Sequence, residues 1–211
     1  MSKYRVSLPG GCWIRSSPQF AENKVGSLLV ASPVEVTGEA QNGFYPIQMW
    51  VHGSVLMPES TVPYISQWST TAGIITSDCG ETCALMLAQS NGKALDKTVD
   101  DCVRLLNNYD GYTDANDLCN LLAFLGLEGK QTHVVAERTI CLIDYSLVPP
   151  ELKQDQSYKG YHWAICVSVA GGEVIYHDPD FWGNDTWKGA NKRVSLADFQ
   201  SWCKGVYVCA S

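Results

Sequence analysis

The sequence lacks several features that would assign it to common classes of protein. Its 211 residues include nine cysteines but no Cys-x-x-Cys pair, the spacing used by zinc ribbons and thioredoxin-like redox sites. No apolar run reaches the ~20 residues that cross a bilayer, and no apolar segment follows the polar N-terminus. We therefore expect a protein that is cytoplasmic as synthesised and has no membrane span.

Positive charge is also scarce. Lys and Arg number 15 against 22 Asp and Glu, which gives a net charge of −7. An acidic surface argues against nucleic acid or an anionic membrane as the main partner. Most cysteines lie beside apolar residues, as Cys166 does between Ile165 and Val167, which is typical of reduced, buried thiols. A disulfide between Cys203 and Cys209 is the alternative.

The first part of the chain, residues 1–58, shows no helical periodicity. Short runs rich in Val, Ile and Tyr are separated by turn signals such as Pro9-Gly10-Gly11 and Asn42-Gly43. Several short strands in so few residues predict a small β-barrel. A polar segment with two prolines, residues 57–63, is typical of a linker, so a second domain is expected over 62–211.

The second domain is expected to begin with helices. Asp78 and Glu81 form a potential capping box for the first helix, and Asn91-Gly92 would end it. Further helices are expected over 99–107, after Asp114, and over 196–202 with Ser195 as its cap.

Strands are expected over 132–135, 139–145, 161–169, 173–178 and 206–209. Helices followed by an antiparallel sheet predict an α+β fold.

Cys79 is the candidate nucleophile. It lies in the first turn of a helix that is apolar from Cys83 to Ala88, and such a helix is expected to be buried. Free N–H groups and the helix dipole favour a thiolate at this end. The alternative is that Cys79 is another core cysteine, but its polar neighbours argue against it.

His162 is the candidate base and lies at the head of the strand expected over 161–169. One face of that strand carries large apolar side chains, whereas the other carries His162 and the small residues Ala164, Cys166 and Ser168. Small residues would let the first helix pack closely, so His162 is expected to face that helix. The alternative is a structural core histidine.

Asp178 is the candidate orienter of His162, and the hairpin loop decides whether it can reach that residue. A two-residue turn at Gly171-Gly172 would pair Asp178 with Ile165, on the wrong face. A three-residue loop would pair it with Ala164, diagonal to His162. We therefore predict the odd-length loop with a glycine bulge. The alternative role for Asp178 is to start an Asp-Pro turn.

Gln67 precedes the nucleophile, and its amide could donate to a developing oxyanion beside the Cys79 N–H. The alternative is a surface glutamine. His133 would permit a zinc site with Cys79 and His162 in principle, but a structural role is favoured for it. No metal or organic cofactor is expected.

Two resemblances to known families add to these inferences. Within residues 1–58, the segments Trp13-Ile14-Arg15, Gly43-Phe44-Tyr45-Pro46 and Trp50-Val51-His52-Gly53 resemble bacterial SH3-like domains. The second domain resembles papain-like cysteine peptidases of the bacteriocin-processing type and their stand-alone relatives. That resemblance is carried by the motifs Val62-Pro63-Tyr64-Ile65-Ser66-Gln67, Asp78-Cys79-Gly80, Gly160-Tyr161-His162-Trp163 and Asp178-Pro179.

The second resemblance implies Cys79 as nucleophile, His162 as base, Asp178 as orienter and Gln67 in the oxyanion hole. The expected function is therefore hydrolysis of peptide bonds through an acyl-enzyme. SH3-like domains often accompany cell-wall binding, which suggests a peptidoglycan substrate and a lysin that reaches the cell wall by another route. A soluble protease that uses the barrel as an exosite, and a papain-like shell that only binds, are the alternatives.

Overall fold

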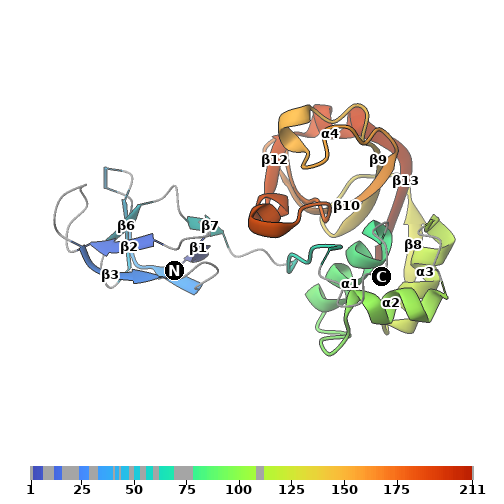
Figure 1. Cartoon of the computed structure of the whole chain (residues 1–211), viewed down its shortest axis with the longest axis horizontal. Helices are drawn as coiled ribbons and strands as arrows, with labels where there is room; N and C mark the ends of the chain where they lie inside the picture. Colours follow the sequence, from blue (N-terminus) through green and yellow to red (C-terminus); the bar gives the residue numbers. More distant parts are fainter. Residues whose placement is uncertain are drawn as a thin grey trace. The chain divides into compact units, whose positions relative to one another are not determined.

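The chain divides into two compact units, Met1–Ser60 and Thr61–Ser211. This computed structural model describes residues 2–6, 12–15, 24–28, 33–39, 41–42, 44–47, 50–52, 56–58, 62–68, 78–107 and 112–210 (Figure 1). Each unit is considered by itself below.

The first unit contains short antiparallel strands in two small sheets. One sheet has the order β4-β1-β7 and the other the order β3-β2-β6-β5. The strands are β1 (Ser2–Val6), β2 (Cys12–Arg15), β3 (Lys24–Leu28), β4 (Pro33–Val36), β5 (Phe44–Pro46), β6 (Trp50–His52) and β7 (Leu56–Pro58). The Trp50-Val51-His52 motif forms β6, whereas other parts of the expected barrel lie outside the described residues.

The described residues of the second unit form four α-helices and a six-stranded sheet. The helices are α1 (Cys79–Ser90), α2 (Val99–Leu106), α3 (Ala115–Phe124) and α4 (Leu196–Trp202), with 3-10 helices η2 (Pro150–Leu152) and η3 (Gly183–Gly189). The sheet has the order β12-β11-β10-β9-β13-β8. Its strands are β8 (Gly129–Thr132), β9 (Thr139–Asp144), β10 (Tyr161–Ala170), β11 (Glu173–His177), β12 (Lys192–Ser195) and β13 (Cys203–Ala210).

Every strand pair in this sheet is antiparallel, so the unit has the expected α+β architecture. The strand expected over 132–135 is wrong in its bounds: the observed strand, Gly129–Thr132, lies three residues earlier and shares only Thr132 with the prediction. Gly129, at the start of this strand, packs against α3. A Cβ atom added at Gly129 would lie 2.8 Å from the Cα atom of Cys119. Strand β12 was not predicted, since its four residues include only one large apolar side chain.

The helix caps differ from the prediction at α1. Thr98 and Asp114 begin α2 and α3 with complete capping boxes, formed with Asp101 and Asp117. The capping box predicted for α1 is wrong: the Asp78 side chain makes no capping hydrogen bond with the described residues.

Glu81, the expected partner in that box, has a different role. It is fully buried, and its carboxylate accepts a hydrogen bond of 2.8 Å from the Thr113 hydroxyl. Glu81 is therefore buried in the protein interior, whereas in an exposed helix N-terminus it would cap the backbone N–H groups.

The sheet separates two hydrophobic clusters. Helices α1, α2 and α3 cover one face, where their residues pack with Trp163, Ile165 and Val167 of β10. Helix α4 covers the other face through Phe199 and Trp202 (Figure 1).

The prediction that His162 shares a face with α1 is wrong. Ala164 and Cys166 belong to the cluster beneath α4, and His162 has the same parity along β10. The small side chains that allow helix and strand to approach closely are on α1 and not on β10. The large residues of β10 pack against small residues of α1 such as Cys83, Ala84 and Ala88.

The β10–β11 hairpin also differs from the prediction. Its loop contains only Gly171 and Gly172, since Ala170 pairs with Glu173. Both glycines have positive φ values, 60° and 80°, as a tight turn of this kind requires. The predicted three-residue loop is therefore wrong.

A bulge inside β10 supplies the register shift that the loop was expected to supply. Pairing is interrupted between Cys166 and Ser168, and beyond the interruption Ile165 pairs with His177. Continuing that register by one residue places Asp178 opposite Ala164, on the face that carries His162. The bulge also turns Val169 toward the cluster beneath α4.

The eight cysteines outside the first unit are free thiols, including Cys203 and Cys209. The alternative of a disulfide between those two is therefore wrong. No helix in the described part of the chain is long and apolar enough to cross a membrane.

The capping boxes lead to a stability prediction. Replacing Asp114 with Ala should lower the free energy of unfolding by about 1 kcal/mol, because two N–H groups at the start of α3 lose their acceptor. Urea denaturation measures this change. Asp96→Ala is the control, because Asp96 makes an exposed ion pair with Lys97 and should change stability by less than about 0.5 kcal/mol. Equal effects of the two substitutions would contradict the capping role.

Candidate functional site

Cys79 lies at the N-terminus of α1 and is partly exposed. The start of this helix packs tightly against β10, because a Cβ atom added at Gly80 would lie 2.9 Å from Thr113 and 3.1 Å from Trp163. One turn further along α1, the Cys83 thiol is within 3.5 Å of the Trp163 carbonyl oxygen. These contacts hold the first turn of α1 beside the first residues of β10.

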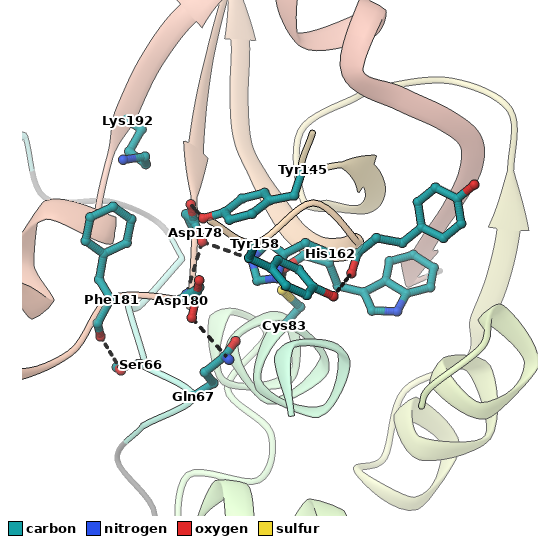
Figure 2. Close-up of polar contacts among 12 residues, drawn as sticks. Ser66, Gln67, Cys83, Tyr145, Tyr158, His162, Asp178, Asp180, Phe181 and Lys192 are labelled. Atoms are coloured by element: carbon teal, nitrogen blue, oxygen red, sulfur yellow. Dashed lines mark hydrogen bonds and ion pairs between the residues drawn. The ribbon is translucent and has the colours of Figure 1, made fainter. Parts of the chain in front are cut away.

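His162 and Asp178 form a buried pair at the same end of the sheet. The Nε2 atom of His162 lies 2.9 Å from Oδ1 of Asp178 (Figure 2). The two side chains are only 4% and 0% exposed. Asp178 follows the last residue of β11, and the β10 bulge places it on the His162 face. Since Nε2 faces Asp178, Nδ1 is the ring nitrogen left for a reaction partner.

Several groups stabilise the negative charge of Asp178. Its Oδ2 atom accepts a hydrogen bond of 2.7 Å from the Tyr145 hydroxyl, and its Oδ1 atom accepts one of 3.0 Å from the Asp180 N–H. Burial would raise the pKa of Asp178, but His162, Lys192 and the Tyr145 hydrogen bond together lower it below its usual value. Asp178 is therefore ionised at neutral pH.

The surroundings of His162 favour the protonated form of its imidazole. Burial opposes the charge on the imidazole, but the charges of Cys79 and Asp178, and hydrogen bonds with both, raise the pKa of His162 well above its usual value. The structure thus brings Cys79, His162 and Asp178 together in an electrostatic unit at one end of the sheet. They meet because each is at the end of its element.

Gln67 belongs to an extended segment, residues 62–68, that runs along the loop after β11. Its backbone N–H donates to the Pro179 carbonyl oxygen at 3.1 Å, and the Ser66 hydroxyl donates to the Phe181 carbonyl oxygen at 2.6 Å (Figure 2). The Gln67 side chain is buried rather than exposed, so the surface alternative is wrong. Its Nε2 atom lies 3.4 Å from Oδ1 of Asp180.

Asp180 is a buried carboxyl group beside this amide. Its Oδ1 atom also accepts a hydrogen bond of 3.0 Å from the Trp68 indole N–H. Burial is the main cause that raises the pKa of Asp180 to about 6, with a further contribution from Asp178. Asp178 and Asp180 therefore titrate in different pH ranges, although they are two residues apart.

Sequence reasoning missed Tyr145, Asp180 and Lys192 as parts of the site. Tyr145 could have been found from the alternation along β9, since Cys141 and Ile143 lie on the face beneath α4. The sequence pattern gives no comparable signal for Asp180 or Lys192. Asp180 is placed by the geometry of a loop, and Lys192 lies in strand β12, which was not predicted.

The other two histidines of the second unit lie away from this arrangement. His177 is buried and bonded through Nε2 to the Val62 carbonyl oxygen and through Nδ1 to the Asn191 N–H. Burial lowers the pKa of His177 to about 4, so it is neutral. His133 is exposed. Among residues that the structure describes, no three His, Cys, Asp or Glu side chains are grouped as metal ligands.

Comparisons with known proteins found similar folds only among solved structures. No protein-family model matches the sequence, and no curated protein matches it significantly. The peptidase domain of Streptococcus ComA, a bi-functional ABC transporter involved in quorum sensing, is 18% identical with a TM-score of 0.49 over 70% of this chain and 96% of that domain. A double-glycine-motif protease from an AMS/PCAT transporter, solved with its leader peptide, is 14% identical with a TM-score of 0.48 over 71% and 90% of the two chains. The corresponding domain of Streptococcus mutans ComA is 20% identical with a TM-score of 0.39 over 70% and 97%.

Asp78, the neighbour of Cys79, gives a prediction about stability and pH. Burial, followed by the charges of Glu81 and Asp100, raises the pKa of Asp78 from 3.8 to about 7. Between these two values the folded protein holds a proton that the unfolded chain releases, so stability falls as the pH rises from about 4 to 7. Asp78→Asn should remove this dependence.

The expected gain for Asp78→Asn at pH 8 is about 1 to 2 kcal/mol after allowance for solvent screening. At pH 4 the variant and the wild type should have nearly equal stability. Urea denaturation across this range measures both values. A variant that is less stable than the wild type at pH 8 would contradict the buried, protonated carboxyl group.

Proposed function

We propose that the protein is a cysteine peptidase with a papain-like second unit, in which Cys79, His162 and Asp178 form the catalytic triad. The observation that carries this proposal is the placement of His162. Its imidazole is buried between the ionised Asp178 and the thiol at the N-terminus of α1, and its pKa is raised. A protonated imidazole beside a thiol at a helix N-terminus is the arrangement that produces a reactive thiolate.

The mechanism follows from these positions. The Cys79 thiolate attacks the carbonyl carbon of a peptide bond, and the carbonyl oxygen takes up the negative charge. His162 then gives its proton to the leaving nitrogen, the C–N bond breaks, and a thioester with Cys79 remains. Water attacks the thioester while His162 takes up a proton, which releases the acid and restores the thiolate. Asp178 keeps the ring oriented throughout.

Gln67 is proposed to bind the oxyanion together with the backbone N–H of Cys79. Its backbone N–H is bonded to Pro179, and its side-chain Nε2 atom lies 3.4 Å from Oδ1 of Asp180, so both parts of the residue have a partner before the substrate arrives. Preorganised donors of this kind stabilise a developing charge without a cost of reorientation during the reaction.

The first unit is proposed to be a bacterial SH3-like barrel that directs the enzyme to cell-wall peptides. Its short antiparallel strands in two small sheets, including Trp50–His52, support this assignment. Incubation of the full chain with muropeptides and, separately, with unfolded casein tests the substrate class. Cleavage of casein alone would favour the soluble protease, and binding of either substrate that is unchanged in Cys79→Ala, without cleavage by the wild type, would favour a binding protein.

Selective alkylation tests the proposed triad. Iodoacetamide at pH 5 should label Cys79 at least about tenfold faster than any other cysteine, because a helix N-terminus and an imidazolium partner make a thiol more reactive than an ordinary one. Mass spectrometry after brief exposure identifies the modified residue. His162→Ala should abolish the advantage, and His133→Ala, at an exposed position, is the matched control. If Cys79 reacts no faster than the other cysteines, the proposal fails.

The role of Gln67 can be separated from that of the triad. Gln67→Ala should lower kcat for peptide hydrolysis by roughly 100- to 1000-fold, the cost of removing one oxyanion donor. The same variant should keep the wild-type rate of alkylation at Cys79, since alkylation forms no oxyanion. Gln131→Ala, an exposed glutamine bonded to Asn116, should leave both rates unchanged. Equal losses in hydrolysis and alkylation would indicate instead that Gln67 supports the thiolate.

A further inference from the structure

Tyr145 is a buried residue that contacts both members of the His162–Asp178 pair. It lies directly after β9 and is 0% exposed. Its hydroxyl donates to Oδ2 of Asp178 at 2.7 Å, and its ring centroid is 4.6 Å from that of His162 (Figure 2). Burial, followed by the charge of Asp178, raises the pKa of Tyr145 far above its usual range, so the hydroxyl stays protonated and remains a donor.

A buried lysine holds the backbone around Tyr145. Lys153 is only 7% exposed, and its ammonium group donates to the carbonyl oxygens of Tyr145 and Tyr158 at 3.0 and 3.4 Å. The same group lies 5.3 Å from the centroid of the Tyr145 ring. A buried ammonium group is stable only when it is well bonded. These contacts therefore fix the segment between β9 and β10 in one arrangement.

Tyr158 packs beside Tyr145 at the start of β10. Its hydroxyl donates to the Tyr161 carbonyl oxygen at 2.9 Å, and its ring centroid is 5.8 Å from that of Tyr145. The tyrosine ring rests on Gly160, where an added Cβ atom would overlap it.

We propose that Tyr145 is a positioning residue of the triad, whose hydroxyl fixes the Asp178 carboxylate so that its other oxygen holds the His162 ring toward Cys79. This inference rests on the proposed function. The alternative is that Tyr145 only fills the core beneath α4. The two roles make different predictions, because filling the core requires the ring, whereas positioning requires the hydroxyl.

Loss of the hydroxyl has a definite chemical consequence. Oδ2 of Asp178 would lose its donor, the carboxylate could rotate, and its pKa would rise because the Tyr145 hydrogen bond is one of the contributions that lower it. Protonation of Asp178 removes the charge that supports the imidazolium form of His162. The thiolate would then be lost at a higher pH than in the wild type.

Tyr145→Phe is the test, with Tyr176→Phe as its matched control. Tyr176 is equally buried, lies on the same face of the sheet, and its hydroxyl bonds to no residue that the structure describes. The rate of Cys79 alkylation by iodoacetamide is measured from pH 4 to pH 8 in the full chain. We expect Tyr145→Phe to react roughly ten- to a hundredfold more slowly at pH 5, the value of one hydrogen bond to a charged group. The acidic limb of this pH profile, the range in which the alkylation rate falls as the pH is lowered, should move to higher pH in Tyr145→Phe. The profile of Tyr176→Phe should match that of the wild type.

A second variant covers the case in which Tyr145→Phe does not fold. Incorporation of 3-fluorotyrosine at position 145 keeps the ring and makes the hydroxyl a stronger donor, so the acidic limb should move to lower pH. A wild-type limb in the folded Tyr145→Phe protein, or in the fluorotyrosine protein, would overturn the positioning role. Slow alkylation of Cys79 in the wild type would instead overturn the proposed function, so the two failures are distinguishable.

Discussion

The hydrogen bond between His162 and Asp178 is the interaction on which the rest of the site depends. Both groups are removed from water, and a buried charged pair is stable only when its remaining hydrogen-bonding positions are satisfied. The surroundings meet that requirement through the Tyr145 hydroxyl, the Asp180 N–H and the charge of Lys192. Tyr145 and Lys192 come from other parts of the chain, whereas Asp180 is two residues from Asp178. The pair therefore needs the segment after β9 and strand β12 to be in place beside the end of β11.

The carboxyl groups in and beside the site differ in their pKa values and therefore in their protonation at a given pH. Asp178 is surrounded by donors and stays ionised, whereas burial raises the pKa of Asp180 to about 6 and that of Asp78 to about 7. Acidic side chains that differ in this way can serve different purposes in one site. Of these three carboxyl groups, that of Asp178 bonds to the imidazole, so a negative charge is placed where it supports His162.

The sequence predicts the elements of this unit better than it predicts how they pack. Helices α2, α3 and α4 begin after Thr98, Asp114 and Ser195, because a capping side chain is a local signal that needs only neighbouring residues. The cap expected for α1 failed because burial of Glu81 overrides that local preference. The four candidate site residues were found by residue type and order, and their roles remain predictions.

The alternation of large and small side chains along β10 did not predict which of its residues face α1 and which face α4. The expected large face, which ran to Val169, is broken by the bulge, so Val169 lies on the opposite face from Val167. A bulge has no strong local sequence signal, since it depends on which arrangement of both strands buries the most apolar surface. The alternation along β9 indicates the face on which Tyr145 lies, but not its importance, which depends on a carboxylate 33 positions further along the chain.

The bulge in β10 has a practical consequence for the hairpin. Because the register that brings Asp178 to His162 is set inside the strand, the Gly171-Gly172 tip has no part in aligning them. An added Cβ atom at either glycine would meet no described atom within 4 Å. The tip is therefore a suitable place to attach a fluorophore or an affinity peptide, so that the protein can be followed or immobilised without changing the distance between the two side chains.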